Sequence, residues 1–238
     1  MKEEIKSNIA VAEPEIEQPP IPIIRNTPYK LKTSQKVYIF FKSIFDWILA
    51  LLVLVVGLPV WIILAIAIKC DSKGPAIFKH TRIGKDRKPF KCYKWRSMSI
   101  NAPKHKASRD FNDADTYITK VGSFIRKTSI DEFAQIFNIL TFKMSWIGYR
   151  PLCKNDEEID KMRLERGIYQ IKPGISGWAQ VNGRDLVTNK HKAEYDEYYL
   201  KNISLKLDIK IFFLTLRKIF KKEDIKEGSI ASNGDEKQ

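Results

Sequence analysis

The sequence predicts a mainly helical α+β protein in which a membrane-embedded helix precedes a larger domain that contains a small β-hairpin. The first observation is a run of 21 uncharged, mostly apolar residues, Ile48 to Ile68, which as a helix is long enough to cross a hydrocarbon core. The second is an alternation of apolar and basic residues just after this run, as in strands. The third is a set of apolar residues at helical spacing that continues to residue 220. With 44% hydrophobic residues in a chain of 238, wholesale disorder is excluded.

The positive charge is concentrated in one part of the chain. The net charge is +14, and residues 69–109 alone contribute +11, with 13 basic and 2 acidic side chains. Such an excess indicates an anionic partner. The three cysteines, Cys70, Cys92 and Cys153, form no CxxC pair, so neither a disulfide framework nor a zinc site is expected and a reducing compartment is indicated.

The N-terminal elements are a tail and a membrane helix. Residues 1–36 are polar and rich in proline, which predicts a disordered tail. Residues 37–69 predict the membrane helix, with Pro59 near its middle, where a proline kinks or breaks a helix. Both flanks are basic, and positive flanks favour the cytoplasmic side. A re-entrant helix broken at Pro59 satisfies both flanks; a spanning helix that tolerates its proline is the alternative.

Residues 70–222 predict the main domain, and residues 223–238 a second polar tail. Two strands are expected within residues 76–98, with a turn at 84–88, followed by a polar loop at 101–116. Residues 116–140 predict two helices that meet at 127–129, residues 156–167 an amphipathic helix, and residues 173–184 a turn-rich loop. The helical region 190–221 ends in a segment, 205–220, that mixes apolar and basic residues, as in a core helix or a helix lying on a membrane surface.

The most informative local pattern is the acidic pair Asp131–Glu132. Ser129 followed three residues later by Glu132 predicts a capping box, with both carboxylates at a helix N-terminus. Helix stability alone explains acidic residues there. The functional interpretation is that a carboxylate nucleophile lies beside a phosphate held by the helix N-terminus and Arg126.

Further cations stand in turns and strands of the main domain. Arg150 and Arg184 lie close to glycines, where a guanidinium can grip two phosphate oxygens. Lys94 lies on the second expected strand. A surface salt bridge or a solvated strand position is the alternative for each of these side chains.

Five strings along the chain resemble the initiating bacterial sugar transferases, which are small monotopic polyprenyl-phosphate phosphoglycosyl transferases. The resemblance extends from Val37 to Phe220 and is carried by FDWILALLVLVVGLPV, GPAIFKHTRIGKDRKPFKCYKWRSM, VGSFIRKTSIDEFAQIFNIL, KPGISGWAQVNGR and EYDEYYLKNISLKLDIKIFFLTL. It implies a re-entrant helix, broken at Pro59, on the cytoplasmic face of the bacterial inner membrane. A catalytic domain with interfacial amphipathic helices is expected over residues 70–222.

The resemblance also implies the reaction. Such enzymes transfer a sugar-1-phosphate from a UDP-sugar to undecaprenyl phosphate with Mg²⁺ and release UMP, as the first membrane step of exopolysaccharide, capsule or lipopolysaccharide assembly. Asp131 is implied as the nucleophile that forms an aspartyl phosphosugar, and Glu132 as an aid to Mg²⁺ binding or proton handling, so both are expected at the metal. The positions that match the family's other polar site residues are Lys94, Arg126, Arg150 and Arg184, expected to bind phosphate, and Asp196.

Other partners and functions follow less directly. Anionic lipid is an expected partner, and a second copy or downstream glycosyltransferases are further ones. Aromatic residues interleave with basic ones in residues 69–109, as in proteins that bind single-stranded nucleic acid, but the adjacent apolar run favours lipid and a diphosphate substrate, so no nucleic acid is expected.

Some positions depart from the family pattern. The departures are Leu58 for a serine, Phe142-Lys143 for Gly-Asp, Tyr149 for a proline, and Phe133-Ala134 for Leu-Pro. Because they lie close to expected site residues and to the helix break, a catalytically weakened membrane scaffold of a glycan assembly complex is the alternative function.

Overall fold

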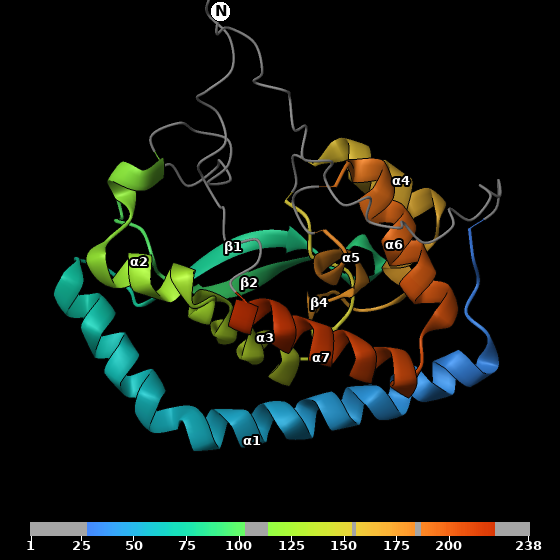
Figure 1. The fold of residues 1–238 in the computed structure, drawn as a ribbon, viewed down its shortest axis with the longest axis horizontal. Coiled ribbons are helices and arrows are strands. Elements are labelled where there is room, and N and C mark those ends of the chain that lie inside the picture. Colours follow the sequence, from blue (N-terminus) through green and yellow to red (C-terminus); the bar gives the residue numbers. More distant parts are fainter. Residues whose placement is uncertain (1–27, 103–113, 154–155, 184–186, 222–238) are drawn as a thin grey trace, which may run out of the picture.

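The computed structural model describes residues 28–102, 114–153, 156–183 and 187–221. Figure 1 shows a long helix that runs beneath a mainly helical body. The helices and strands in chain order are α1 (Thr33–Asp71), β1 (Ile77–Ile83), η1 (Lys85–Arg87), β2 (Pro89–Trp95), η3 (Ala114–Tyr117), α2 (Lys120–Lys127), η4 (Ile130–Gln135), α3 (Ile136–Leu140), β3 (Ser145–Ile147), α4 (Glu157–Glu165), η5 (Ile168–Gln170), β4 (Gly174–Ser176), α5 (Trp178–Val181), α6 (Asn189–Asn202) and α7 (Leu205–Lys221), where η denotes a 3₁₀ helix. The predicted mainly helical α+β class is confirmed.

Helix α1 is long and apolar enough to cross a membrane, and only 11% of its most apolar window is buried inside the protein. It is bent, and its second part turns up toward α2 (Figure 1). Pro59 lies inside this helix, and an interior proline is the usual cause of a bend. The helix is nevertheless continuous through Pro59, where the sequence predicted a break.

The start of α1 lies four residues before the predicted boundary at residue 37. Gln35 is buried, and its Nε2 donates hydrogen bonds to the carbonyls of Leu200 (3.2 Å) and Lys201 (3.0 Å) at the end of α6. These long-range bonds fix the first turn, so the predicted polar tail ends earlier than residue 36. Residues 1–27 and 222–238, which hold the rest of the two predicted tails, lie outside the described residues.

The predicted hairpin is confirmed. Strands β1 and β2 are antiparallel, in a register that pairs Ile77 with Trp95 and Ile83 with Pro89. In β2, the side chains of Phe90, Cys92 and Trp95 are buried, whereas Lys91 is exposed. Burial raises the pKa of the Cys92 thiol, which keeps it protonated and unreactive.

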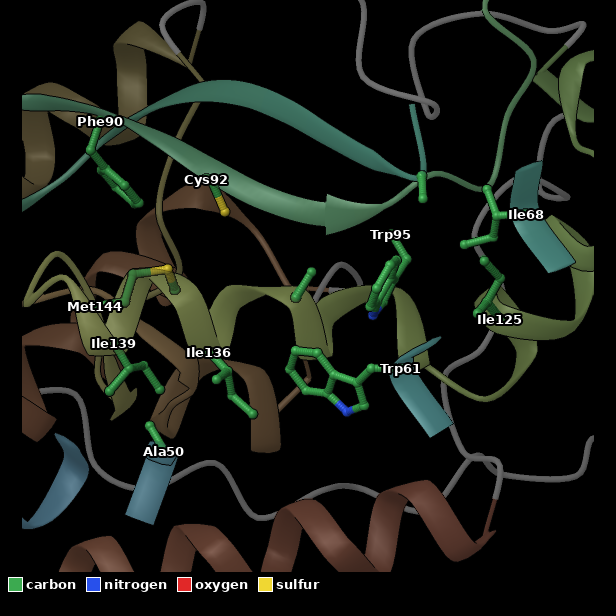
Figure 2. Packing of buried hydrophobic residues seen from close by; sticks show 12 residues of the cluster. Ala50, Trp61, Ile68, Phe90, Cys92, Trp95, Ile125, Ile136, Ile139 and Met144 are labelled. Atoms are coloured by element: carbon green, nitrogen blue, oxygen red, sulfur yellow. The ribbon is translucent and has the colours of Figure 1, made fainter. Parts of the chain in front are cut away.

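The first hydrophobic cluster joins the hairpin, α3 and the membrane-length helix. Figure 2 shows Phe90, Cys92 and Trp95 of β2 above the side chains of α3, with Trp61 of α1 beside Ile136 and Ala50 of α1 below. Trp61 makes edge-to-face contacts with Trp95, at 5.8 Å between ring centroids, and with Phe137, at 5.6 Å. Helix α1 therefore contributes side chains to the same core as the main domain.

The second cluster lies around α6, α7 and a small parallel sheet. Strands β3 and β4 pair Ser145 with Gly174 and Ile147 with Ser176. The predicted loop at 173–184 thus contains β4 and the single-turn helix α5. Two strands of three residues are too short to show an alternating pattern, so the sequence could not reveal their pairing.

Candidate active site

The acidic pair lies in the 3₁₀ helix η4, packed against β2. Ser129 has the left-handed φ of 55° and makes no capping hydrogen bond with its side chain. The predicted capping box is therefore wrong. The side chain of Glu132 pairs with cations from two other parts of the chain.

Those cations are Lys94 of β2 and Arg150, which follows β3. Lys94 Nζ lies 3.1 Å from Glu132 Oε1 and 3.4 Å from Asp131 Oδ2. Both terminal nitrogens of Arg150 lie 3.2 Å from the same Glu132 oxygen. The side chains of Asp131 and Glu132 are only 15% and 13% exposed, so water screens these ion pairs less than it would at the surface.

A buried asparagine holds this arrangement against the hairpin. Asn138 of α3 accepts a hydrogen bond from the backbone N–H of Tyr93 (2.9 Å) and donates one to the carbonyl of Lys91 (2.7 Å). It thereby pairs with β2 on both sides of Cys92, at backbone groups next to Lys94. The sequence analysis missed Asn138; its only signal was an amide within an otherwise apolar helix.

The remaining predicted site residues are placed differently. Arg126 of α2 donates from Nε to Ser97 Oγ at 3.0 Å. Arg184 lies outside the described residues. Asp196 of α6 is buried and forms an ion pair with Arg163 of α4 at 2.5 Å, so it contacts a guanidinium of another helix. Burial raises the pKa of Asp196, and the positive charge of Arg163 opposes that rise.

The structure also gives Arg96 a role that the sequence analysis missed. Its buried guanidinium donates to the carbonyls of Lys73 (2.7 Å), Ile68 (3.0 Å) and Ser72 (2.6 Å), where α1 ends. Arginine commonly satisfies the unpaired carbonyls of a helix C-terminus in this way. Arg96 thus joins the end of α1 to the chain just after β2.

A magnesium ion would find oxygen donors at Asp131 and Glu132. Among the described residues, no three His, Cys, Asp or Glu side chains gather as a metal site. Mg²⁺ commonly binds through one or two carboxylates and takes its other ligands from water and substrate phosphates. The donor set of the acidic pair therefore fits Mg²⁺ bound together with a phosphate ligand.

Fold and site together define a protein whose acidic pair is held by cations, on a domain that shares its core with a long apolar helix. The family model of the bacterial sugar transferases matches residues 37–222. The chain belongs to the bacterial sugar transferase family, as the resemblance implied.

Named relatives cover most of this chain. The UDP-glucose:undecaprenyl-phosphate glucose-1-phosphate transferase of Escherichia coli is 40% identical over 182 residues, which are 74% of this chain and 39% of the relative. A UDP-N-acetylgalactosamine-undecaprenyl-phosphate N-acetylgalactosaminephosphotransferase of Aeromonas hydrophila is 40% identical over 77% of this chain and 44% of its own. The undecaprenyl-phosphate galactose phosphotransferase of Salmonella typhimurium is 35% identical over 77% of this chain and 41% of its own. The chain thus spans about two fifths of the length of these relatives.

Proposed function

We propose that the protein transfers a sugar-1-phosphate from a UDP-sugar to undecaprenyl phosphate and releases UMP, as the first membrane step of surface polysaccharide or glycoconjugate synthesis. The observation that carries the proposal is the Asp131–Glu132 pair, held by Lys94 and Arg150 on a domain packed against an apolar helix. The named relatives support the two substrates.

The proposed chemistry has two displacements at one phosphorus atom. A carboxylate oxygen of Asp131 attacks the phosphorus that bears the sugar. The bond from this phosphorus to the bridging oxygen breaks, and UMP leaves with that oxygen and its electron pair. A phosphate oxygen of undecaprenyl phosphate then attacks the aspartyl phosphosugar, the bond to Asp131 breaks, and the carboxylate is restored.

The cations of the site supply what this chemistry needs. Two phosphate substrates and a carboxylate nucleophile repel one another, and fixed positive charges offset that repulsion and stabilise charge on the transferring group. We assign phosphate binding to Lys94, Arg126, Arg150 and Arg184. Mg²⁺, held by Asp131 and Glu132, would supply further positive charge to the diphosphate when bound.

The proposed location is the cytoplasmic face of the bacterial inner membrane, with α1 re-entrant. Two features support this topology: α1, which contains Pro59, is bent, and basic residues flank its apolar run on both sides. Exposed apolar residues along α1 and α7 support contact with lipid. They include Phe40, Phe41, Leu52, Val56 and Ile63 on α1, and Leu205, Ile209, Phe212 and Phe213 on α7.

The experiment measures UMP release by the purified protein with Mg²⁺, undecaprenyl phosphate and a series of UDP-sugars. Glucose, galactose and N-acetylgalactosamine are included because the relatives are named for different sugars. We expect release with at least one UDP-sugar, and a burst of about one UMP per protein when undecaprenyl phosphate is omitted, because the covalent intermediate then accumulates.

Asp131→Asn is expected to abolish both the burst and the turnover, since the amide is no nucleophile. The matched control is Asp86→Asn, the same chemical change at an exposed position in the hairpin turn, which should turn over normally. Turnover by Asp131→Asn at the normal rate would overturn the assigned nucleophile. No release from any common UDP-sugar would favour the scaffold alternative.

A further inference from the structure

We propose that Arg163 is a positioning residue for Arg150, and that Asp196 acts on the active site only through Arg163. The inference rests on the proposed function, because Arg150 is assigned there to substrate phosphate. It goes beyond that assignment because it gives the buried Arg163–Asp196 pair, between α4 and α6, a role at the active site through the backbone of Arg150. The sequence predicted Asp196 at the active site itself, whereas the proposal has Asp196 act there through Arg163.

The backbone that carries Arg150 is held at every carbonyl from residue 149 to residue 152. The donors are Gly174 N to Tyr149 O (2.9 Å), Arg163 Nη1 to Arg150 O (2.8 Å), Arg82 Nη1 to Pro151 O (3.4 Å) and Ile83 N to Leu152 O (3.0 Å). The bond at Arg150 itself comes from Arg163. Arg150 in turn reaches Glu132, so Arg163 lies one residue removed from the acidic pair.

Arg163 is itself held rigidly. Its side chain is 2% exposed and its partner Asp196 is 1% exposed. The guanidinium lies over the ring of Tyr149 at 5.1 Å from the centroid, and Tyr149 makes an edge-to-face contact with Tyr169. Tyr149 stands where the family pattern has a proline, and it provides the aromatic face against which Arg163 is packed.

Stability alone gives little reason for a buried ion pair here. Removing two charges from water costs much of what their attraction returns, and an apolar pair of similar volume is often equally stable. A role that an apolar pair cannot fill is the bond to the Arg150 carbonyl. Because a displacement of about 1 Å in a positioning group can cost a hundredfold in rate, fixing this backbone is a sufficient functional reason.

The test replaces the pair by apolar residues of similar volume, Arg163→Met with Asp196→Leu. The matched control is Arg166→Met with Glu197→Leu, because Arg166 and Glu197 also pair, at 3.3 Å, between the α4 and α6 regions. Arg166 donates to Met162 O and not to Arg150. Both double variants should unfold at temperatures near that of the parent. The first should lose about tenfold in kcat/KM for the UDP-sugar and in the rate of the UMP burst, as expected for one lost hydrogen bond to a charged group, while the control keeps both.

Coupling to Arg150 separates positioning from general structural support. In an Arg150→Ala background, the Arg163→Met/Asp196→Leu change should cost almost no further activity, because the side chain that it positions is gone. A second variant, Arg163→Lys, keeps the charge beside Asp196 but lacks the fork that also reaches the carbonyl, and should show the same loss.

Four outcomes are decisive. Full activity of the folded double variant, or a loss that simply adds to that of Arg150→Ala, would overturn the positioning role while leaving the proposed function intact. An active Arg163→Lys that has lost nothing would do the same. A parent protein that releases no UMP would instead overturn the proposed function.

Discussion

At the scale of single residues, Glu132 is the centre of the charge arrangement. One of its oxygens receives both Lys94 and Arg150, which come from β2 and from the chain after β3. A substrate phosphate would offer the same cations a second anion, and the carboxylate keeps their side chains in place until the phosphate arrives. In the proposed reaction, the acidic pair would thus preorganise the cations that bind the substrate phosphate.

Thr119 stands before α2 and Ser129 before η4, and only Thr119 caps its helix with a side-chain hydrogen bond. This difference can be tested directly. Thr119 accepts a hydrogen bond from the Gly122 N–H at 3.0 Å as the N-cap of α2, whereas the Ser129 side chain caps nothing. Thr119→Ala should therefore lower the free energy of unfolding by about 1 kcal/mol, and Ser129→Ala by less than about 0.5 kcal/mol. Denaturant unfolding in detergent, followed by circular dichroism, measures both. Equal losses would restore the capping box at Ser129.

The residues that the sequence did and did not reveal differ in one physical respect. Lys94, Asp131, Glu132 and Arg150 lie in short strings that resemble the family, and the structure brings these four together. Asn138, Arg96 and Arg163 act through partners elsewhere in the chain: Asn138 bonds to Tyr93, 45 residues away. No local pattern of charge or spacing can report such a contact.

At the scale of elements, the contact between α1 and α7 is made by a buried polar cluster. Lys42 of α1 lies 2.9 Å from Asp208 of α7 and 3.5 Å from Asp46. Asp208 also accepts hydrogen bonds from Tyr38 and Tyr199, both at 2.7 Å. The two carboxylates share one lysine, so their charges depend on it.

Lys42→Met should therefore destabilise the protein strongly, by about 3–5 kcal/mol, because it leaves two carboxylates buried without their cation. The control is Lys36→Met, the same change at an exposed position of the same helix, which should cost less than about 0.5 kcal/mol. Denaturant unfolding in detergent compares the two. Similar unfolding free energies for both variants would show that the cluster does not hold α1 to the domain.

The helices and strands could be predicted where each is long enough to show a regular spacing of apolar residues. The hairpin was predicted because apolar and basic residues are interspersed on both sides of a turn within residues 76–98, and the helical region at 190–221 because its apolar spacing continues over many residues. The sequence did not predict that η4 is a 3₁₀ helix, because its residues have the spacing of an α-helix. The left-handed Ser129 and the contacts of Glu132 accompany the 3₁₀ form, and neither is visible in the sequence. The helix α1 continues through Pro59, and Trp61, two residues later, packs against Trp95 and Phe137 of the main domain, contacts between distant parts of the chain that no local pattern reveals.

At the scale of the whole molecule, the apolar faces of α1 and α7 belong to neighbouring helices, since Lys42 and Asp208 join them. Figure 1 shows both helices on the same side of the molecule. Both helices carry exposed apolar side chains, among them Phe40, Phe41 and Leu52 on α1 and Phe212 and Phe213 on α7, and clustered exposed apolar residues commonly mark a surface that binds a membrane or a partner. This distribution supports a body that rests on a lipid surface, as the proposed location requires.

Cysteine labelling tests the re-entrant topology. Single cysteines at Lys36 or Lys73, in a background in which Cys70 and Cys153 are replaced by serine, should both be shielded from a membrane-impermeant thiol reagent in intact cells and react after permeabilisation. Cys92 can stay, because it is buried and its raised pKa keeps it protonated. Labelling of one site only in intact cells would establish a spanning helix.

The bonds from Arg96 to the end of α1 have a mechanical consequence. Lys94 lies two residues before Arg96, so the end of α1 is tied by hydrogen bonds to the chain directly after the strand that presents a cation to the acidic pair. Only Trp95 separates Lys94 from Arg96, so no flexible linker between them could adapt to a difference in bilayer thickness. The depth at which α1 is immersed would therefore set the height of the carboxylates above the plane of the lipid headgroups, and a thicker or thinner bilayer would change how the reaction centre meets a lipid-borne phosphate.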